Sequence, residues 1–398
     1  MQLLVGAAVK NSTVISSLNS GETKTVSLSW APPSQKTYNV SSCIVPVNNE
    51  IDPSDNIKSA NVTTEKGIIR VGASQRYKTI QEAVDAARAG DTIMVANGIY
   101  AEVVNVYKNF LTLNGENKKS TIIDCKGVID TWGFAIVGVA HVQVSGFTIR
   151  NARGEIHDPS IQHSGILLYN VHHSMLTNNI IANNYYYQVS GICLTYLCWN
   201  NTIENNTIKF NRIGITLYKV HQTNIIRGNL IMQNGFGGGI VEKCGGMFLY
   251  QTLNNSIYHN NFVNNLYYQL INDDSPSNQW CGRWGVSGNY WSDYNGTDNG
   301  SGGRIAGNGI GDTNLPHQGV DYHPLMGGWL PGDITHDGRV DASDLGRIAY
   351  SWYKTPEDSD WYTWHAHADL NEDGIVDAAD LAIVGSNWYK TWQQYWEI

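Results

Sequence analysis

Three stretches of the chain follow one pattern: GILLYNVHHSMLTNNII (residues 165–181), GICLTYLCWNNTIENNTI (191–208) and GITLYKVHQTNIIRGNLI (214–231). In each, a glycine opens an apolar run, and an asparagine 14 or 15 residues later opens a second, shorter run. A fourth copy places Gly246 15 residues ahead of Asn261. Successive asparagines are 27, 23 and 32 residues apart, which indicates one repeat with insertions. Repeats of this length, built from short strands and turns, are typical of a parallel β-helix.

Each coil of such a solenoid stacks on the next at the strand spacing of about 4.8 Å. Equivalent side chains of Asn179, Asn206, Asn229 and Asn261 would then form a column inside the stack. There they can satisfy one another and the backbone of the turns. The repeat therefore predicts a mainly β fold with an internal asparagine ladder.

Both ends of the repeat region carry sequences suited to cover open strands. Residues 79–89 predict a helix with a capping box, Thr79 with Glu82, and with Gly90 just past its end. The stretch TIQEAVDAARAGDTI (79–93) resembles the N-terminal cap of pectin-lyase-like β-helices. Residues 278–326, which include GNYWSDYNGTDNGSGGRIAGNGIGDTN, resemble the C-terminal end of NosD-like periplasmic β-helix proteins. The resemblance spans about residues 68–326 and implies a right-handed, single-stranded parallel β-helix.

The C-terminal part of the chain holds two copies of one loop, DITHDGRVDASD (333–344) and DLNEDGIVDAAD (369–380), 36 positions apart. Oxygen-bearing side chains stand at loop positions 1, 3, 5, 9 and 12, and glycine stands at position 6. A hard cation such as calcium takes six to eight oxygen ligands, and the glycine allows the sharp turn around it. Each loop runs into an amphipathic helical pattern. The duplication predicts two calcium loops followed by helices.

From about Pro331 onward the tail resembles a type I dockerin, a calcium-dependent module that binds cohesin domains of scaffold or surface proteins. The resemblance implies two calcium ions. Their ligands would be Asp333, Thr335, Asp337, Asp341, Asp344 and the backbone carbonyl of Arg339 in the first loop, and Asp369, Asn371, Asp373, Asp377, Asp380 and the backbone carbonyl of Ile375 in the second. Thr335 stands where Asp or Asn is usual, so we expect the first site to be weaker. The cohesin-facing positions would be Ala342, Ser343, Ala378 and Ala379, where known dockerins carry Ser/Thr pairs.

The first part of the chain has a different pattern. Residues 18–56 alternate apolar and polar side chains between turn signals, as half-buried strands do. They resemble the second half of a CARDB-type immunoglobulin-like module. Because a sandwich of that kind needs about 100 residues, we expect this sequence to start within a domain, with a signal peptide lost upstream. The predicted domains are a partial CARDB-like sandwich (1–66), the β-helix (67–328) and the dockerin (331–398).

The charges separate the tail from the rest. Residues 331–398 carry 13 acidic and 4 basic residues, which equals the net charge of −9 of the whole chain, and residues 1–330 carry 22 of each sign. This neutrality gives no electrostatic case for binding nucleic acid or for steering an anionic polymer. No apolar run reaches the ~18 residues of a membrane span. The calcium loops and several Asn-X-Ser/Thr triplets indicate an extracellular or cell-surface protein. The six cysteines show no zinc-type spacing, and we expect buried free thiols.

Catalytic residues are harder to find. Pectin-lyase-like enzymes cluster carboxylates on neighbouring coils, but between His163 and Asn272 the only acids are Glu204 and Glu242, which occupy different positions of the repeat. A glycoside hydrolase needs its two carboxylates roughly 5–9.5 Å apart. The remaining candidates lie in loops, namely Asp273, Asp274, Glu155 and Asp158. Turn formation is the simpler explanation for these residues.

Two further groups of residues are candidates for binding. The run Tyr185, Tyr186 and Tyr187 lies in a coil insertion, where aromatic rings can stack on sugar rings. Residues His172, Cys198 and His221 each stand seven positions after a coil glycine, and on stacked coils they would form an outer column suited to copper or zinc. Leu253 breaks that column, so exposed turn residues are the preferred interpretation.

The sequence thus favours an extracellular β-helix protein that binds, and as an enzyme would degrade, polysaccharide by lyase or glycoside hydrolase chemistry, tethered to a cohesin by its dockerin. One alternative is a non-catalytic surface or adhesion protein in which the β-helix is a spacer. The third hypothesis is a NosD-like copper-handling protein.

Overall fold

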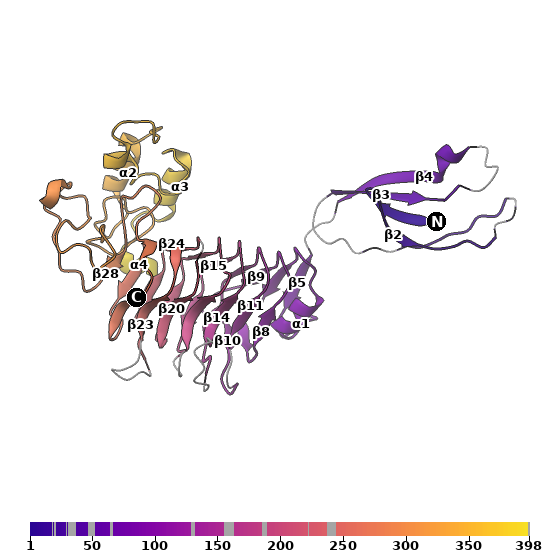
Figure 1. Cartoon of the computed structure of the whole chain (residues 1–398), viewed down its shortest axis with the longest axis horizontal. Coiled ribbons are helices and arrows are strands. Elements are labelled where there is room, and N and C mark those ends of the chain that lie inside the picture. The colour runs from indigo at the N-terminus through magenta and orange to yellow at the C-terminus, as the bar shows by residue number, and fades with distance from the viewer. Residues whose placement is uncertain are drawn as a thin grey trace.

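The computed structural model describes residues 1–17, 19, 21–28, 30, 37–46, 52–63, 67–128, 132–154, 163–184, 189–221, 223–236 and 244–396. Its central body is a solenoid of short parallel strands, as the repeat predicts (Figure 1). From β6 to β26, each coil contributes one strand to each of three parallel sheets. No helix of the described residues is long and apolar enough to cross a membrane.

The three sheets run the length of the solenoid. The first contains β5 (Ile68–Val71), β6 (Thr92–Val95), β9 (Thr112–Gly115), β12 (Gln143–Ser145), β15 (Met175–Thr177), β18 (Thr202–Glu204), β21 (Ile225–Arg227), β24 (Leu253–Tyr258) and β27 (Ser277–Gln279). The second contains β7 (Gly98–Tyr100), β10 (Thr121–Asp124), β13 (Thr148–Arg150), β16 (Ile180–Ala182), β19 (Thr207–Lys209), β22 (Leu230–Met232), β25 (Asn261–Val263) and β28 (Tyr290–Trp291). The third contains β8 (Val104–Val106), β11 (Phe134–Val137), β14 (Ser164–Tyr169), β17 (Ser190–Thr195), β20 (Ile213–Tyr218), β23 (Gly245–Tyr250) and β26 (Tyr268–Asp273).

Asparagine ladders lie inside the turns, as the repeat predicts. The ladder on which the prediction was based runs through Asn179, Asn206, Asn229, Asn260 and Asn289, and each side-chain amide donates to the next Oδ1 at 2.9–3.1 Å. Two more ladders, which the sequence did not predict, start at Asn184 and Asn201. All five members of the first ladder are fully buried, so every coil that carries it depends on its neighbours for hydrogen bonding.

The fourth repeat differs from the prediction by one residue. Asn260, not Asn261, continues the ladder, because β25 pairs with β22 so that Asn261 stands beside Leu230. The side chain of Asn261 instead bonds the backbone of Trp329, accepting from its N–H at 2.6 Å and donating to its carbonyl at 3.1 Å. Asn261 therefore ties the last coils to the segment that leads into the C-terminal domain.

Both ends of the solenoid are covered. Helix α1 (Ile80–Ala86) has the predicted capping box of Thr79 and Glu82 and buries Ile80, Ala83 and Val84 on the first coil. It ends three residues earlier than predicted, where the Lys108 amine donates hydrogen bonds to its last carbonyl groups. At the other end, Trp291 stacks on Phe262 with ring centroids 4.2 Å apart and closes the core.

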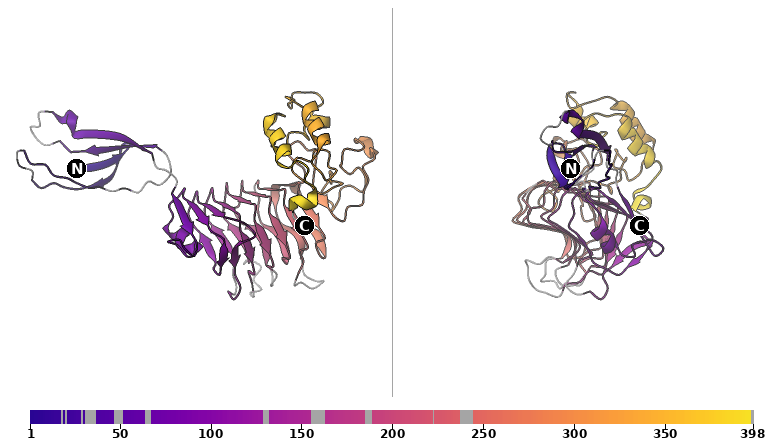
Figure 2. Two further views of the ribbon diagram at one scale, coloured as in Figure 1. Left: turned by 180° about the vertical axis from the view of Figure 1, so that it is seen from behind. Right: turned by 90° about the vertical axis from the view of Figure 1, so that its right-hand side faces the viewer.

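Residues before and after the solenoid form separate units (Figure 2). β1 (Gln2–Val5), β2 (Ala8–Ser12), β3 (Thr37–Cys43) and β4 (Ile57–Thr63) form an antiparallel sheet in the order β2-β1-β3-β4, with a 3-10 turn at Pro53–Asn56. Its CARDB-like identity stays a prediction. The C-terminal unit contains α2 (Ala342–Tyr350), a π-helical turn (Trp361–His365), α3 (Ala378–Ser386) and α4 (Trp392–Trp396), and a 3-10 turn at Ser301–Gly303 precedes it. This unit packs over the last coils (Figures 1 and 2).

Candidate functional site

In the first duplicated loop, backbone N–H groups donate hydrogen bonds to the carboxylates at loop positions 1 and 12. Asp333 accepts from the backbone N–H of Asp337 at 3.1 Å and of Gly338 at 2.8 Å. Asp344 accepts from Ile334 and Thr335 with one oxygen and from Asp341 with the other, which also caps α2. Gly338 has a φ of 87°, the left-handed conformation that the sharp turn needs. The loop is thus folded around a common centre.

The second loop repeats this geometry 36 residues later. Asp369 accepts from Asp373 at 3.1 Å and Gly374 at 3.0 Å, and Asp380 accepts from Leu370 at 2.7 Å. Gly374 has a φ of 99°. The N–H groups of Arg339 and Ile375, at position 7 of each loop, bond the carboxylates of Asp337 and Asp373. Within each loop, backbone N–H groups therefore orient the carboxylates at positions 1 and 12, and the two predicted ligand sets stay a prediction.

The electrostatics of these loops suits a dication. Burial raises the pKa of Asp333 to about 7, and the like charges of Asp344 and Asp337 act in the same direction. Burial likewise raises the pKa of Asp369 to about 6, with the charges of Asp380 and Asp373 adding to it. In the described residues, no three His, Cys, Asp or Glu side chains already converge as a finished metal site. The side chains are nevertheless hard oxygen ligands, and a bound calcium ion would offset the repulsion between their negative charges. The residues of both loops therefore fit a calcium ion.

The helices after the two loops are related in the same way. Ile348 of α2 and Val384 of α3 are buried in the core of the C-terminal unit. The four predicted cohesin-facing residues, Ala342, Ser343, Ala378 and Ala379, are all exposed in the first turns of these helices. Leu345 and Leu381, one turn further, are 40% and 37% exposed. The two helices therefore offer a matched pair of small, partly apolar surfaces.

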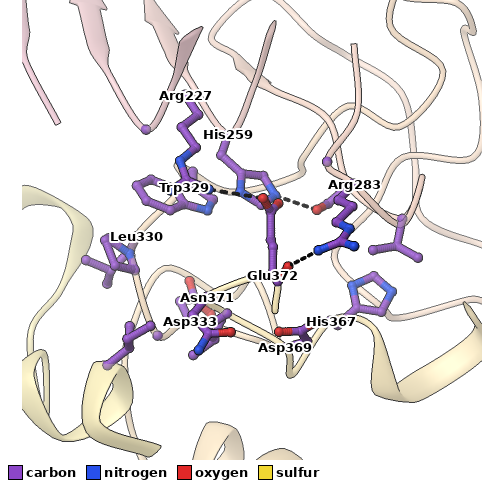
Figure 3. Close-up of a pocket in the computed structure, with 18 of the residues that line it drawn as sticks. Arg227, His259, Arg283, Trp329, Leu330, Asp333, His367, Asp369, Asn371 and Glu372 are labelled. Carbon is purple, nitrogen blue, oxygen red and sulfur yellow. Dashed lines mark hydrogen bonds and ion pairs between the residues drawn. The ribbon is translucent and has the colours of Figure 1, made fainter. Parts of the chain in front are cut away.

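A cavity of about 370 Å³ separates this unit from the last coils of the solenoid (Figure 3). Glu372, at position 4 of the second loop, crosses it and accepts hydrogen bonds from Tyr258 at 2.7 Å and from Arg227 at 3.0 Å. Arg227 also pairs with Glu204 at 2.9 Å. Of the two acids in the body of the β-helix, Glu204 thus takes part in the contact between the two domains. Glu242 lies outside the described residues.

Two neighbouring residues at the end of the solenoid hold the second loop. The indole Nε1 of Trp284 donates to Oδ2 of Asp369 at 2.8 Å, and Arg283 donates to the backbone carbonyl of Glu372 at 2.6 Å. This contact was not predicted from the sequence. The one available signal was that the repeats differ at position 4, where Glu372 replaces His336.

Of the four predicted catalytic candidates, the structure describes the chain at Asp273 and Asp274, which are neighbours in the sequence, and their catalytic role stays a prediction. Asp274 follows β26 and has a φ of 53°, a typical turn conformation for Asp. Asp273 ends β26. Glu155 and Asp158 lie outside the described residues, so their roles stay predictions.

The outer column considered for His172, Cys198 and His221 does not form, and the preferred interpretation of all three as exposed turn residues is wrong for Cys198. Cys198 is 1% exposed, and its sulfur points to the backbone carbonyls of Leu168 and Thr195. His221 is exposed and His172 is half-buried, where it stacks on Trp199 at 4.7 Å. The column fails because Trp199, not Cys198, stands beside His172, since this coil has one extra residue between its strands, which equal spacing from the coil glycines does not reveal.

Tyr185, Tyr186 and Tyr187 lie outside the described residues, but another set of tyrosines forms a row. In the third sheet Tyr169, Thr195, Tyr218 and Tyr250 stand side by side on consecutive coils. Tyr196 fills the gap left by Thr195, with its ring 5.0 Å from that of Tyr169. Tyr218 and Tyr250 stack at 4.9 Å. These four rings make an aromatic strip along the solenoid.

Solved structures with a similar arrangement include several proteins named for pectin or alginate. Pectate lyase Pel9A matches with 12% identity over 59% of this chain and 72% of its own, with a TM-score of 0.45. The alginate lyase from Paenibacillus sp. str. FPU-7 matches with 13% identity over 53% and 75%, with a TM-score of 0.34. Pectin methylesterase from carrot matches with 16% identity over 49% and 64%, with a TM-score of 0.26. No curated protein matches the chain.

Two family models match the sequence. One, for the type I dockerin domain, covers residues 331–387 and confirms the resemblance of the tail. The other covers residues 84–296, more than half of the 398 residues, and includes all the coils that carry the asparagine ladders. The chain therefore belongs to the family described as periplasmic copper-binding protein (NosD), and it carries a type I dockerin domain at its C-terminal end.

Proposed function

We propose that this chain is an extracellular polysaccharide-binding β-helix protein that attaches, through its calcium-loaded dockerin, to a cohesin domain. The observation that carries the proposal is the pair of preformed calcium loops, each leading into a helix with an exposed surface. The carboxylates at positions 1 and 12 are already oriented by backbone N–H groups, which reduces the rearrangement that calcium binding requires.

The helices α2 and α3 supply the docking surface. Their first turns present Ala342, Ser343 and Leu345 on one helix and the matching Ala378, Ala379 and Leu381 on the other. Small residues allow close backbone approach by a partner, and the two leucines supply apolar anchors. Because the surfaces are related by the 36-residue repeat, the partner could seat on either helix in two related orientations.

The tyrosine strip supplies the glycan-binding surface. Tyr169 and Tyr196 are each 40% exposed, and Tyr218 and Tyr250 are half-buried beside them. Such rings are flat, rigid and amphipathic, which suits stacking of sugar rings. Successive coils place rings at steps of about 4.8 Å, so an extended chain can follow the solenoid axis. Because residues 1–330 carry no net charge, we propose an uncharged polysaccharide as the ligand.

Affinity gel electrophoresis tests the glycan part with pectin, polygalacturonate, alginate, xylan and β-glucan as probes. We expect retardation by an uncharged glycan, and its loss in Tyr218→Ala with Tyr250→Ala. The control Tyr322→Ala, which removes a 56% exposed ring in the C-terminal segment, should behave as wild type. Retardation by no probe would contradict glycan binding and favour the spacer hypothesis. Release of reducing sugar or unsaturated product from any probe would show that the protein is also an enzyme.

A further inference from the structure

The geometry points to the β-helix as a part of the second calcium site: Trp284 positions the calcium ligand Asp369, so that calcium binding by this loop and docking of the dockerin on the last coils depend on each other. This inference is independent of the cohesin and glycan proposed above. It concerns only contacts inside the chain.

The contact reaches the first ligand of the loop directly. Asp369 is 3% exposed, and its Oδ2 accepts both the backbone N–H of Gly374 at 3.0 Å and the indole N–H of Trp284 at 2.8 Å. Its Oδ1 accepts from the N–H of Asp373. These donors fix the plane of the carboxylate before any ion arrives. The indole is the one donor among them that belongs to the β-helix.

The two loops differ in this respect. The matching carboxylate, Asp333, takes its backbone donors from Asp337 and Gly338, and its side-chain donor is the Thr335 hydroxyl of its own loop at 3.4 Å. These hydrogen bonds come from within the dockerin. The chain therefore provides an internal comparison, because the same carboxylate occurs once with and once without a bond from the solenoid.

Trp284 is held in place by contacts with both units. Its ring meets Trp361 of the dockerin edge-to-face at 5.5 Å. The guanidinium of Arg283 lies over the same ring at 4.6 Å and donates to the carbonyl of Glu372. A rigid indole can keep a hydrogen bond to a ligand with little loss of side-chain entropy. Residues 283 and 284 thus hold the second loop at positions 1 and 4.

Glu372 provides a second link between the two units, and its side chain extends toward Arg227 (Figure 3). Its Oε2 accepts from Tyr258 and Arg227, which belong to neighbouring coils, and it is not itself expected to bind calcium. Moving the dockerin away from the solenoid would break these bonds together with the Trp284 bond. Arg227 would then lose its ion pair with Glu372 and keep only the ion pair with Glu204.

Linkage makes the coupling reciprocal. If docking improves calcium binding at the second loop by some factor, calcium improves docking by the same factor. Groups that orient a metal ligand from outside the coordination sphere typically change metal affinity by about 10–100-fold. Calcium therefore shifts the dockerin toward the docked arrangement, and removal of calcium shifts the equilibrium toward an undocked one.

The test uses the full chain with Asp344→Asn added to weaken the first loop, so that calorimetry reads the second. In this background we expect Trp284→Phe to lower calcium affinity about tenfold. The matched control is Trp352→Phe, at a 37% exposed tryptophan after α2, which should leave affinity unchanged. Equal affinities in the two variants would overturn the proposal. A loss of first-loop affinity when Trp284→Phe is made alone would also contradict it.

Small-angle X-ray scattering provides a second reading that does not depend on Trp284. We expect the maximum dimension of the wild type to be smaller in calcium than in EGTA. Glu372→Gln, which leaves every calcium ligand intact, should show the larger dimension in calcium as well. A wild-type dimension that does not respond to calcium would overturn the coupling, whatever the protein binds.

Discussion

Asn229 donates from its Nδ2 to the Oδ1 of Asn260 at 2.9 Å, one step of a ladder that runs through the C-terminal coils of the β-helix. The Asn229 amide also donates to the carbonyls of Ile203 and Arg227, and its Oδ1 accepts from Asn206. A single side chain therefore satisfies three coils at once.

Replacing Asn229 by Ala should destabilise the β-helix by about 3 kcal/mol, because several buried polar groups lose their partners. Urea unfolding followed by circular dichroism measures the change. The control Gln143→Ala, at an exposed position of β12, should change stability by no more than about 0.5 kcal/mol. Equal effects of the two substitutions would show that the ladder is not a source of stability.

Removing a position-12 carboxylate should weaken calcium binding. Asp380 is fully buried and organises the second loop through Leu370, Asn371 and Asp377. We expect Asp380→Asn to lower the calcium affinity of this loop by at least about tenfold. Asp358→Asn, which removes a surface partner of Lys354, is the control. Isothermal titration calorimetry with calcium chloride measures the affinity. The prediction is wrong if Asp380→Asn binds calcium as tightly as the wild type and the control do.

Acid should loosen the docking of the dockerin. Burial, together with the charges of His336, Arg227 and His367, lowers the pKa of His259 well below its usual value. His259 stacks on Trp329 and bonds Ser287. Because the half-buried imidazole of the docked form stays neutral while the exposed one binds a proton near a pH of about 6.5, the docked form loses stability as the pH falls below about 6.5.

Differential scanning calorimetry in saturating calcium can measure this effect. The melting temperature of the dockerin should fall between about pH 7.5 and about pH 5, and His259→Asn, which tolerates the φ of 57° at this position, should reduce the fall. A wild-type melting temperature that rises over the same interval would contradict the sign of this prediction.

The cysteines should behave as inert thiols. All six are free, and Cys125, Cys193, Cys198 and Cys244 are buried. Burial raises the pKa of Cys198 to about 11 and that of Cys125 to about 12. Since the thiolate is the reactive form, Ellman's reagent should label only Cys43 and Cys281 in the native protein. Rapid native labelling of Cys198 would show that it is accessible, as the copper-handling hypothesis requires.

Much of the fold was predictable because it repeats. The glycines before each apolar run mark places where coils touch: a Cβ on Gly214 would lie 2.3 Å from the carbonyl of Gly246. Side-chain amides can satisfy a turn only as a column, so the spacing of Asn179, Asn206 and Asn229 was enough to predict that the coils stack. The sequence predicted Asn261 as the next member of the ladder, whereas the structure has Asn260 there. The error arose because an insertion changes the coil length at this point and two asparagines are adjacent.

The calcium loops were predictable for the same reason, since each ligand has a copy 36 residues away. The contact of Trp284 with Asp369 was not. It joins residues 85 positions apart in different domains, and neither the repeat of the coils nor that of the loops contains it. The buried position of Cys198 was also hidden, because the residue beside His172 is Trp199, which stands eight residues after Gly191 and not seven.

We propose that the dockerin attaches this β-helix to a cohesin in a calcium-dependent way. The most direct measurement is biolayer interferometry of the full chain on a panel of immobilised type I cohesin domains, in millimolar calcium and in EGTA. We predict binding to at least one cohesin in calcium, loss of binding in EGTA, and loss in the double variant Leu345→Glu with Leu381→Glu. Binding to no cohesin of the panel, or binding that persists in EGTA, would contradict the claim.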